Sequence, residues 1–332
     1  MPLYLIIEKS ALVLFLFAVT MGVAAYSTWA ERKIAAFLQD RLGPNRAGVF
    51  GLLQPLADGV KMFMKEEFIP SNAEKLLFIA GPGLFMFTAL MTGAVIPWGP
   101  NLQIADLNIG ILYVLGFVSV GVYGIMIGGW ASNNKYSLFG AIRASSQMIS
   151  YELAMGLVVI AIIMLTGSLD LKAIAEQQKG FNWNIIYQPF GFLIYCITAL
   201  AECNRAPFDL PECETELVGG FHTEYSSMKL GFYLFAEYIN MFISAAVIST
   251  LYLGGYNMPG LDYSTMNPIM GNAIAFLVLF TKTLLGVFVF IWVRWTIPRF
   301  RYDQLMHLGW KILIPLAIFN MLLTGAGVLI FG

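Results

Sequence analysis

The sequence predicts an all-α integral membrane protein with eight transmembrane helices and one amphipathic interfacial helix on the cytoplasmic side. Hydrophobic residues make up 58% of the chain and charged residues only 12%, and the mean hydropathy is +0.74, whereas charged residues form roughly a quarter of soluble proteins. The apolar residues form eight runs, each close to the roughly 20 residues that a helix needs to cross a bilayer. Tryptophan occurs only near the ends of these runs, as in interfacial aromatic belts: Trp29, Trp98, Trp130, Trp183, Trp292, Trp295 and Trp310.

The eight predicted spans belong to one transmembrane domain, residues 1–332. They cover about residues 10–30, 76–98, 108–130, 148–168, 184–202, 230–253, 271–294 and 311–331. We expect the first span to be retained, because its uncharged run is longer than the apolar core of a typical signal peptide and no basic segment precedes it.

The distribution of the 19 lysines and arginines predicts the orientation. If the odd-numbered connections are cytoplasmic, these connections hold all the cations except Lys9, Lys172, Lys179 and Lys282, the last of which lies inside the seventh span. The positive-inside bias then places both termini on the outer, periplasmic side. The compact chain favours a bacterial plasma (inner) membrane.

A segment at about residues 51–65 has the pattern of an amphipathic helix. Its apolar side chains recur at helical spacing, with polar ones on the opposite face, and it is too short to span the membrane, so we expect it to lie in the interface plane. Such a helix either anchors the chain or borders a lateral opening for a lipid-soluble molecule. The apolar face comprises Leu52, Leu53, Leu56, Val60, Phe63 and Met64, and the polar face Gln54, Asp58, Lys61 and Lys65.

The cytoplasmic loop 202–229 is strongly acidic. Between Glu202 and Tyr225 it carries the carboxylates Glu202, Asp209, Glu212, Glu214, Glu216 and Glu224, with Arg205 as the single cation. It is either a solvated loop or part of a path for ions or protons.

Two further carboxylates, Glu152 and Glu237, lie inside predicted spans. Each costs roughly 2.5 to 3.5 kcal/mol at the bilayer centre, so neither is expected to face lipid. They either pair with a neighbouring helix, for which Lys282 is an available partner, or handle protons. Their convergence on the acidic loop favours a carboxylate route.

Other classes of site are not indicated. Cys196, Cys203 and Cys213 match no zinc or iron–sulfur spacing, and two histidines are too few for paired haem ligands. The sequence has no phosphate-binding glycine loop and no nucleophile elbow. We therefore expect no metal site and no redox cofactor on this chain, and a net charge of −1 gives no sign of nucleic-acid binding.

Five segments resemble, in order and spacing, the core membrane subunit of respiratory complex I, called the H subunit in bacteria and subunit 1 in mitochondria. They are ERKIAAFLQDRLGPNRAG, LLQPLADGVKMFMKEEFIP, SNNKYSLFGAIRASSQMISYELAMG, AECNRAPFDLPECETELVGGFHTEYSSMK and PRFRYDQLMHLGWK. The chain departs from that family at Cys203 and Cys213, which are small replacements. Its third span also lacks an acidic residue that some relatives carry.

The resemblance implies a subunit at the base of the membrane arm that closes a quinone chamber against the peripheral arm. Quinone is the substrate, and electrons arrive from NADH through a flavin and iron–sulfur clusters on partner subunits. Neighbouring small membrane subunits are the other implied partners. Carried over by position, the quinone-binding residues are Glu31, Arg32, Arg41, Asp58 and Phe63; the proton pathway is Glu152, Glu202, Asp209, Glu212, Glu214, Glu216, Glu224 and Glu237; and Arg205, Arg299 and Arg301 organise the loop or dock partners.

Three alternatives remain at this point. A related subunit of a membrane-bound hydrogenase shares the fold but needs no quinone. A stand-alone proton-coupled transporter is disfavoured because no internal repeat is evident. A purely structural anchor explains the cytoplasmic cations but gives no reason for Glu152 and Glu237.

Overall fold

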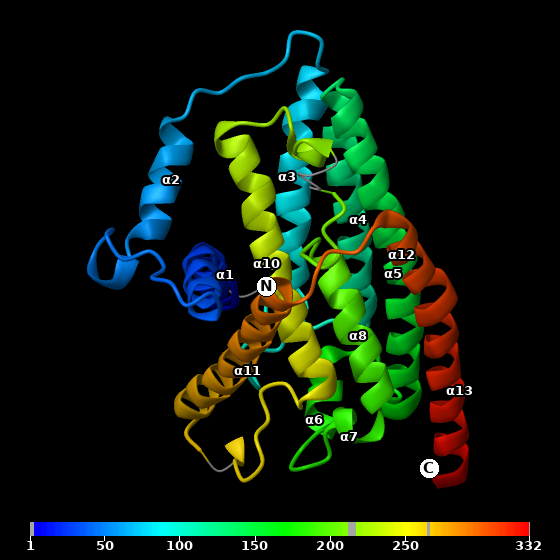
Figure 1. Cartoon of the computed structure of the whole chain (residues 1–332). Helices are drawn as coiled ribbons and strands as arrows, with labels where there is room; N and C mark the ends of the chain where they lie inside the picture. The colour runs from blue at the N-terminus through cyan, green and yellow to red at the C-terminus, as the bar shows by residue number, and fades with distance from the viewer. Residues whose placement is uncertain (1–2, 212–216, 264–265, 332) are drawn as a thin grey trace.

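The computed structural model describes residues 3–211, 217–263 and 266–331, and within these ranges the chain is helical and contains no β-strand (Figure 1). The all-α fold class is therefore confirmed. Seven helical segments of the described chain are long and apolar enough to cross a membrane. They are α1 (Leu3–Leu38), α3 (Lys75–Thr92), α4 (Gly110–Ala131), α5 (Lys135–Thr166), α10 (Ser227–Tyr252), α11 (Pro268–Thr296) and a final segment built from α12 (Tyr302–His307), the π-helical turn η5 (Leu308–Leu313) and α13 (Ile314–Phe331).

Shorter elements connect these helices. They are η1 (Val49–Gly51), α2 (Gln54–Met64), η2 (Gly93–Val95), α6 (Leu171–Gln177), α7 (Asn184–Tyr187), α8 (Pro189–Glu202) and η3 (Gly220–His222). Helix α8 is apolar but has only 14 residues. At a rise of 1.5 Å per residue it extends about 21 Å, which is short of a hydrocarbon core of about 30 Å. The eighth crossing therefore stays a prediction, with α7 and α8 as its candidates.

Helices α3, α4, α5, α8 and α10 run side by side as a bundle, and α13 lies against α5 (Figure 1). Glycines permit close packing: a Cβ added to Gly124 of α4 would come 2.8 Å from the backbone nitrogen of Phe85 on α3. Small residues bring membrane helices together in this way, because apolar side chains alone gain little from leaving lipid for a protein interface.

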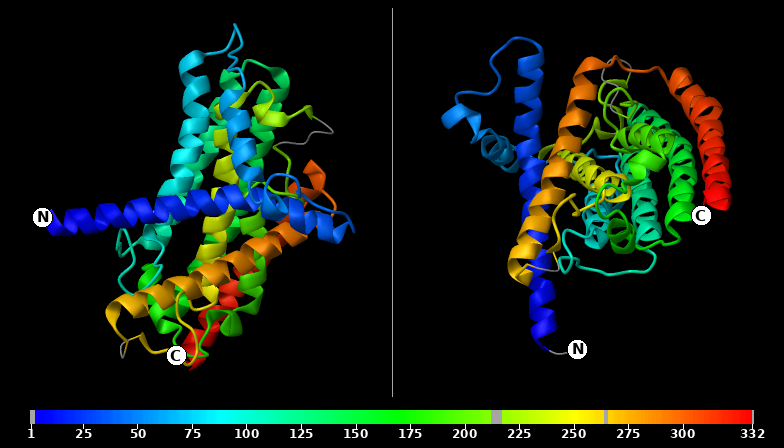
Figure 2. Two further views of the ribbon diagram at one scale, coloured as in Figure 1. Left: turned by 90° about the vertical axis from the view of Figure 1, so that its left-hand side faces the viewer. Right: turned by 90° about the horizontal axis from the view of Figure 1, so that it is seen from below.

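Helix α1 crosses this bundle at a steep angle and contacts α10 and α11 (Figure 2). The predicted first span ends at residue 30, but the helix continues through Glu31 and Arg32 to Leu38. Glu31 is paired inside the protein and so does not end the helix. Asp40, in the left-handed region with φ of 48°, follows the helix end, where a non-glycine residue of this type is tolerated.

Helix α2 stands beside α1, away from the bundle, and contacts α1 and α10 (Figure 1). Pro55 lies in its first turn, where the missing N–H costs nothing. Leu56, Val60 and Phe63 on its outer face are more than 60% exposed. The helix falls inside the range 51–65, while its placement at a membrane surface remains a prediction.

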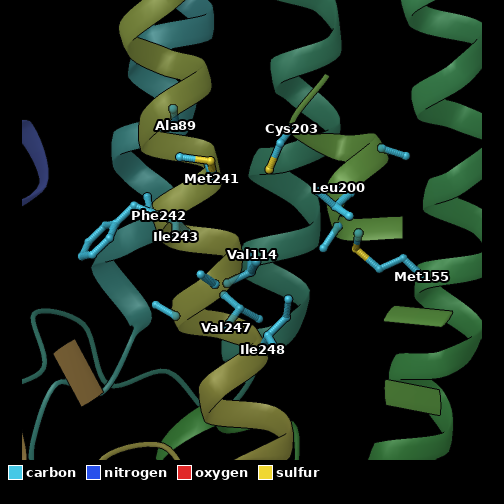
Figure 3. Close-up of a cluster of buried hydrophobic side chains, with 14 of the residues drawn as sticks. Ala89, Val114, Met155, Leu200, Cys203, Met241, Phe242, Ile243, Val247 and Ile248 are labelled. Carbon is cyan, nitrogen blue, oxygen red and sulfur yellow. The ribbon is translucent and has the colours of Figure 1, made fainter. Parts of the chain in front are cut away.

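A dry cluster fills the centre of the bundle (Figure 3). All of its labelled members are buried, and they come from α3, α4, α5, α8, α10 and the residue that follows α8: Ala89, Val114, Met155, Leu200, Cys203, Met241, Phe242, Ile243, Val247 and Ile248. Beginning beside Cys203 and Met241, the cluster extends along α10 to Ile248. Among these labelled residues, the Cys203 thiol is the one ionisable side chain.

Lys282 does not pair with a carboxylate, contrary to the partner suggested for Glu152 and Glu237. Its ammonium donates to the backbone carbonyls of Leu253, Gly255 and Asn257 at 2.7, 2.8 and 2.6 Å, matching its three donors. The Trp183 ring lies 5.0 Å away. Lys282 therefore holds the connection between α10 and α11.

Candidate functional site

A cavity of about 420 Å³ opens between α1, α2, α10 and α11. Apolar side chains such as Met62, Leu234 and Phe235 line part of it, and charged groups converge on the remainder. Both its volume and this mixture of apolar wall and few polar groups are typical of small-molecule sites.

A buried ionic cluster forms the floor of this cavity. The Glu31 carboxylate accepts from Arg205 at 3.1 Å and from the Tyr238 hydroxyl at 2.7 Å, and it also pairs with Arg294. The Arg205 Nε lies 3.6 Å from the Glu237 carboxylate, and the Arg205 guanidinium lies 4.0 Å from the Tyr238 ring centroid. Glu31 and Arg205 are each 6% exposed and Glu237 is 3% exposed. We refer to Glu31, Arg205, Glu237, Tyr238 and Arg294 as the ionic cluster.

The ionic cluster is balanced when both carboxylates and both guanidiniums are charged. Removing such charges from water is expensive, and the geometry offsets this cost only while every partner is present. Arginine suits the central position because its planar guanidinium donates in several directions and stacks on an aromatic ring. A change in charge beside the cluster therefore disturbs all its members together.

The rim of the cavity carries a second, weaker ion pair. Arg32 on α1 and Asp58 on α2 lie 2.8 Å apart, with side chains 49% and 34% exposed. Gln54 donates to the other Asp58 oxygen at 3.1 Å. This pair ties α2 to α1 at the cavity mouth.

A second set of carboxylates lies deeper in the bundle. Glu202, 4% exposed, ends α8, and it interacts electrostatically with Glu152 on α5. Glu152 in turn forms a short hydrogen bond with Ser119 on α4. Beyond Glu202, along the axis of α10, lies the dry cluster of Figure 3.

The chain after α8 is held by polar contacts from α5. Buried Gln147 donates to the carbonyls of Ala201 and Phe208 at 2.9 and 2.7 Å. Arg299 donates to Asp209 at 2.7 Å, and the Phe300 N–H donates to the Pro207 carbonyl. These contacts fix Arg205 in the ionic cluster.

Four of the predicted site residues lie away from both sets. Arg41 is exposed and bonds to Gln39, and Phe63 is 71% exposed on the outer face of α2; neither lines the cavity. Glu224 accepts from Asn134 at 2.5 Å in a separate surface depression. Arg301 pairs with Asp303 at 3.4 Å on the surface.

Glu212, Glu214, Glu216 and Cys213 lie outside the described residues. Within the described ranges, no group of three or more His, Cys, Asp or Glu side chains could hold a metal ion.

The structure adds residues that the sequence did not single out. Arg294 and Tyr238 complete the ionic cluster, and Ser119 contacts Glu152. Arg294, a cation at the end of a span, resembles an ordinary membrane anchor, and Tyr238 is the neighbour of Glu237. Only the three-dimensional packing shows that both reach Glu31.

The comparisons with known proteins agree with this picture. A family model described as NADH dehydrogenase matches residues 10–325. The first H subunit of NADH-quinone oxidoreductase from Cytophaga hutchinsonii is 62% identical over 99% of this chain and 99% of its own length. The H subunit of the Flavobacterium johnsoniae enzyme is 62% identical over 98% of this chain and 96% of its own length. NADH-quinone oxidoreductase subunit 8 of Rhodothermus marinus is 46% identical over 100% of this chain and 99% of its own length. These matches confirm the resemblance noted in the sequence, and the chain belongs to the NADH dehydrogenase family.

Proposed function

We propose that this chain is the membrane subunit of an NADH:quinone oxidoreductase that binds quinone in the 420 Å³ cavity and couples its reduction to proton translocation. The observation that carries the proposal is the buried ionic cluster in the wall of a partly apolar cavity between membrane-type helices. The relatives named as H subunits of NADH-quinone oxidoreductase favour this assignment over the hydrogenase alternative.

The cavity suits the headgroup of a lipid quinone. Apolar side chains of α2 and α10 match the ring faces, while Arg205 and Arg294 can stabilise negative charge on a reduced quinone oxygen. The exposed apolar face of α2 extends from the cavity mouth and suits the isoprenoid tail. In this arrangement Glu31, Arg32 and Asp58 contact or shape the quinone site, and Phe63 and Arg41 act outside it.

Coupling follows from the electrostatic balance of the ionic cluster. Negative charge that develops on quinone competes for Arg205 and Arg294, so Glu31 and Glu237 lose part of their compensation and gain affinity for protons. Glu202 and Glu152 carry this change deeper into the bundle. Because the dry cluster lies beyond Glu202 along α10, the route turns sideways through Glu152 and Ser119 rather than crossing along that axis.

The remaining parts of the proposal concern assembly. Flavin and iron–sulfur clusters are on partner subunits, and Arg299, Arg301, Asp209 and Glu224 organise the surface that meets the peripheral arm. Glu212, Glu214 and Glu216 extend the carboxylate route in the acidic loop. The chain spans a bacterial plasma membrane eight times, with both termini outside.

Replacing Asp58 with asparagine tests the quinone site. We expect the KM for quinone to rise up to about fivefold, because a partly exposed ion pair contributes at most about 1 kcal/mol. Electron transfer from NADH to a soluble artificial acceptor in the same complex should not change. Asp106→Asn, a change of the same type on the connection between α3 and α4, is the control. An equal loss in both assays for Asp58→Asn would indicate a defect of assembly and contradict the proposed site.

A further inference from the structure

A second, much smaller cavity lies where five helices meet. Its volume is about 10 Å³, which is about the space that one water molecule needs. Residues of α3, α4, α5, α8 and α10 line it, among them Thr88, Ala89, Thr92, Glu202 and Asn240. Ala89 marks its position near the upper end of the cluster in Figure 3.

The Glu202 carboxylate lines this cavity with an unsatisfied oxygen. Its Oε2 is buried and has no hydrogen-bond partner among the described residues. A buried carboxylate oxygen without a donor is costly, and in proteins such groups are almost always paired with protein or ordered water. The polar atom, its burial and the cavity therefore all indicate a small hydrogen-bond donor.

The other polar groups at the cavity fit a water molecule. The Thr88 and Thr92 hydroxyls donate to the carbonyls of Phe85 and Ala89 at 3.0 and 2.7 Å, which leaves oxygen lone pairs that can accept. The Asn240 amide offers both a donor and an acceptor. A buried water usually makes two to four hydrogen bonds, and Glu202, Asn240 and a threonine supply that number.

We propose that this cavity is a binding site for one water molecule that donates to Glu202 Oε2 and accepts from the Asn240 amide. The water links α8 to α10 one turn after Glu237, so it joins the second set of carboxylates to the helix that carries the ionic cluster. It also supplies the hydrogen bond that an ionised Glu202 needs in this dry layer. Asn240 is thus a positioning residue for Glu202.

The occupancy of the cavity is tested directly in a density map of the assembled membrane complex. In a map that shows other buried waters, we expect a density peak about 2.7 to 3.0 Å from Glu202 Oε2. In the Asn240→Leu complex the peak should be lost. A wild-type cavity without density, or density that persists unchanged in Asn240→Leu, overturns the proposal.

The role of the water rests on the proposed function and has its own measurement. We expect Asn240→Leu to lower proton-coupled quinone reduction about tenfold while electron transfer to a soluble acceptor is kept. Asn320→Leu, the same change at a buried asparagine of α13, is the control and should keep both activities. Thr88→Val, which removes one acceptor, provides a second variant if Asn240→Leu fails to assemble, and should lose part of the coupled rate.

The two proposals fail in distinguishable ways. Normal coupled activity in an assembled Asn240→Leu complex contradicts the positioning role of the water. A water peak in wild type, together with normal activity of a Glu202→Gln complex, supports the water site and contradicts the proposed function.

Discussion

Substitution of Arg205 by methionine is expected to remove nearly all quinone reductase activity. The change deletes the central cation of the ionic cluster and leaves Glu31 and Glu237 with too little positive charge in a buried site. Breaking one partner of a buried ion pair costs about 3 to 5 kcal/mol. The measurement is NADH:quinone activity in assembled complex, compared with NADH oxidation by a soluble acceptor.

A second substitution separates charge from packing. Adding Glu237→Gln to Arg205→Met removes one of the two carboxylates, so we expect assembly and thermal stability to recover in part. Lys179→Met, which deletes an exposed cation next to the largest surface pocket, should behave as wild type. If Arg205→Met alone retained normal quinone kinetics, the ionic cluster would have no part in the quinone site.

Replacing Glu202 with glutamine is expected to lower coupled turnover by two orders of magnitude or more, roughly the contribution of a positioned acid–base group. Glutamine has nearly the same shape but cannot gain or lose a proton, so packing of α8 is kept while the route from the ionic cluster towards Glu152 is interrupted. Proton translocation by complex reconstituted in vesicles is the measurement.

Glu176→Gln is the matched control for Glu202→Gln. Glu176 is an exposed carboxylate of α6 that accepts from Tyr256 at 3.4 Å, and it lies outside both sets of site residues. It should keep normal turnover. Equal activities of the two variants would contradict the carboxylate route.

The sequence predicts the all-helical membrane class well because that class depends on composition and on the length of apolar runs. It predicts Glu31, Arg205, Glu202 and Glu237 as site residues because ionisable groups in or beside a span are costly. The structure places Glu31, Arg205 and Glu237 in one cluster, and Glu202 lies at the small cavity lined also by Asn240.

Other features depend on contacts between segments far apart in the chain. The continuation of α1 through Glu31 depends on the pairing of Glu31 with residues up to 263 positions away. Lys282 suggested a partner for a carboxylate, but a turn that brings three carbonyls together satisfies it instead. Phe63 has the right helix but the wrong face, because apolar spacing alone does not show whether a face meets a cavity or the surroundings.

The most direct test of the coupling is an infrared difference spectrum recorded as quinone is reduced in the assembled complex. The account predicts a carboxyl signal from proton uptake in wild type that is missing in Glu202→Gln and present in Glu176→Gln. A carboxyl signal of the same size in the Glu202→Gln complex would contradict the claim that quinone reduction changes the protonation of this buried carboxylate.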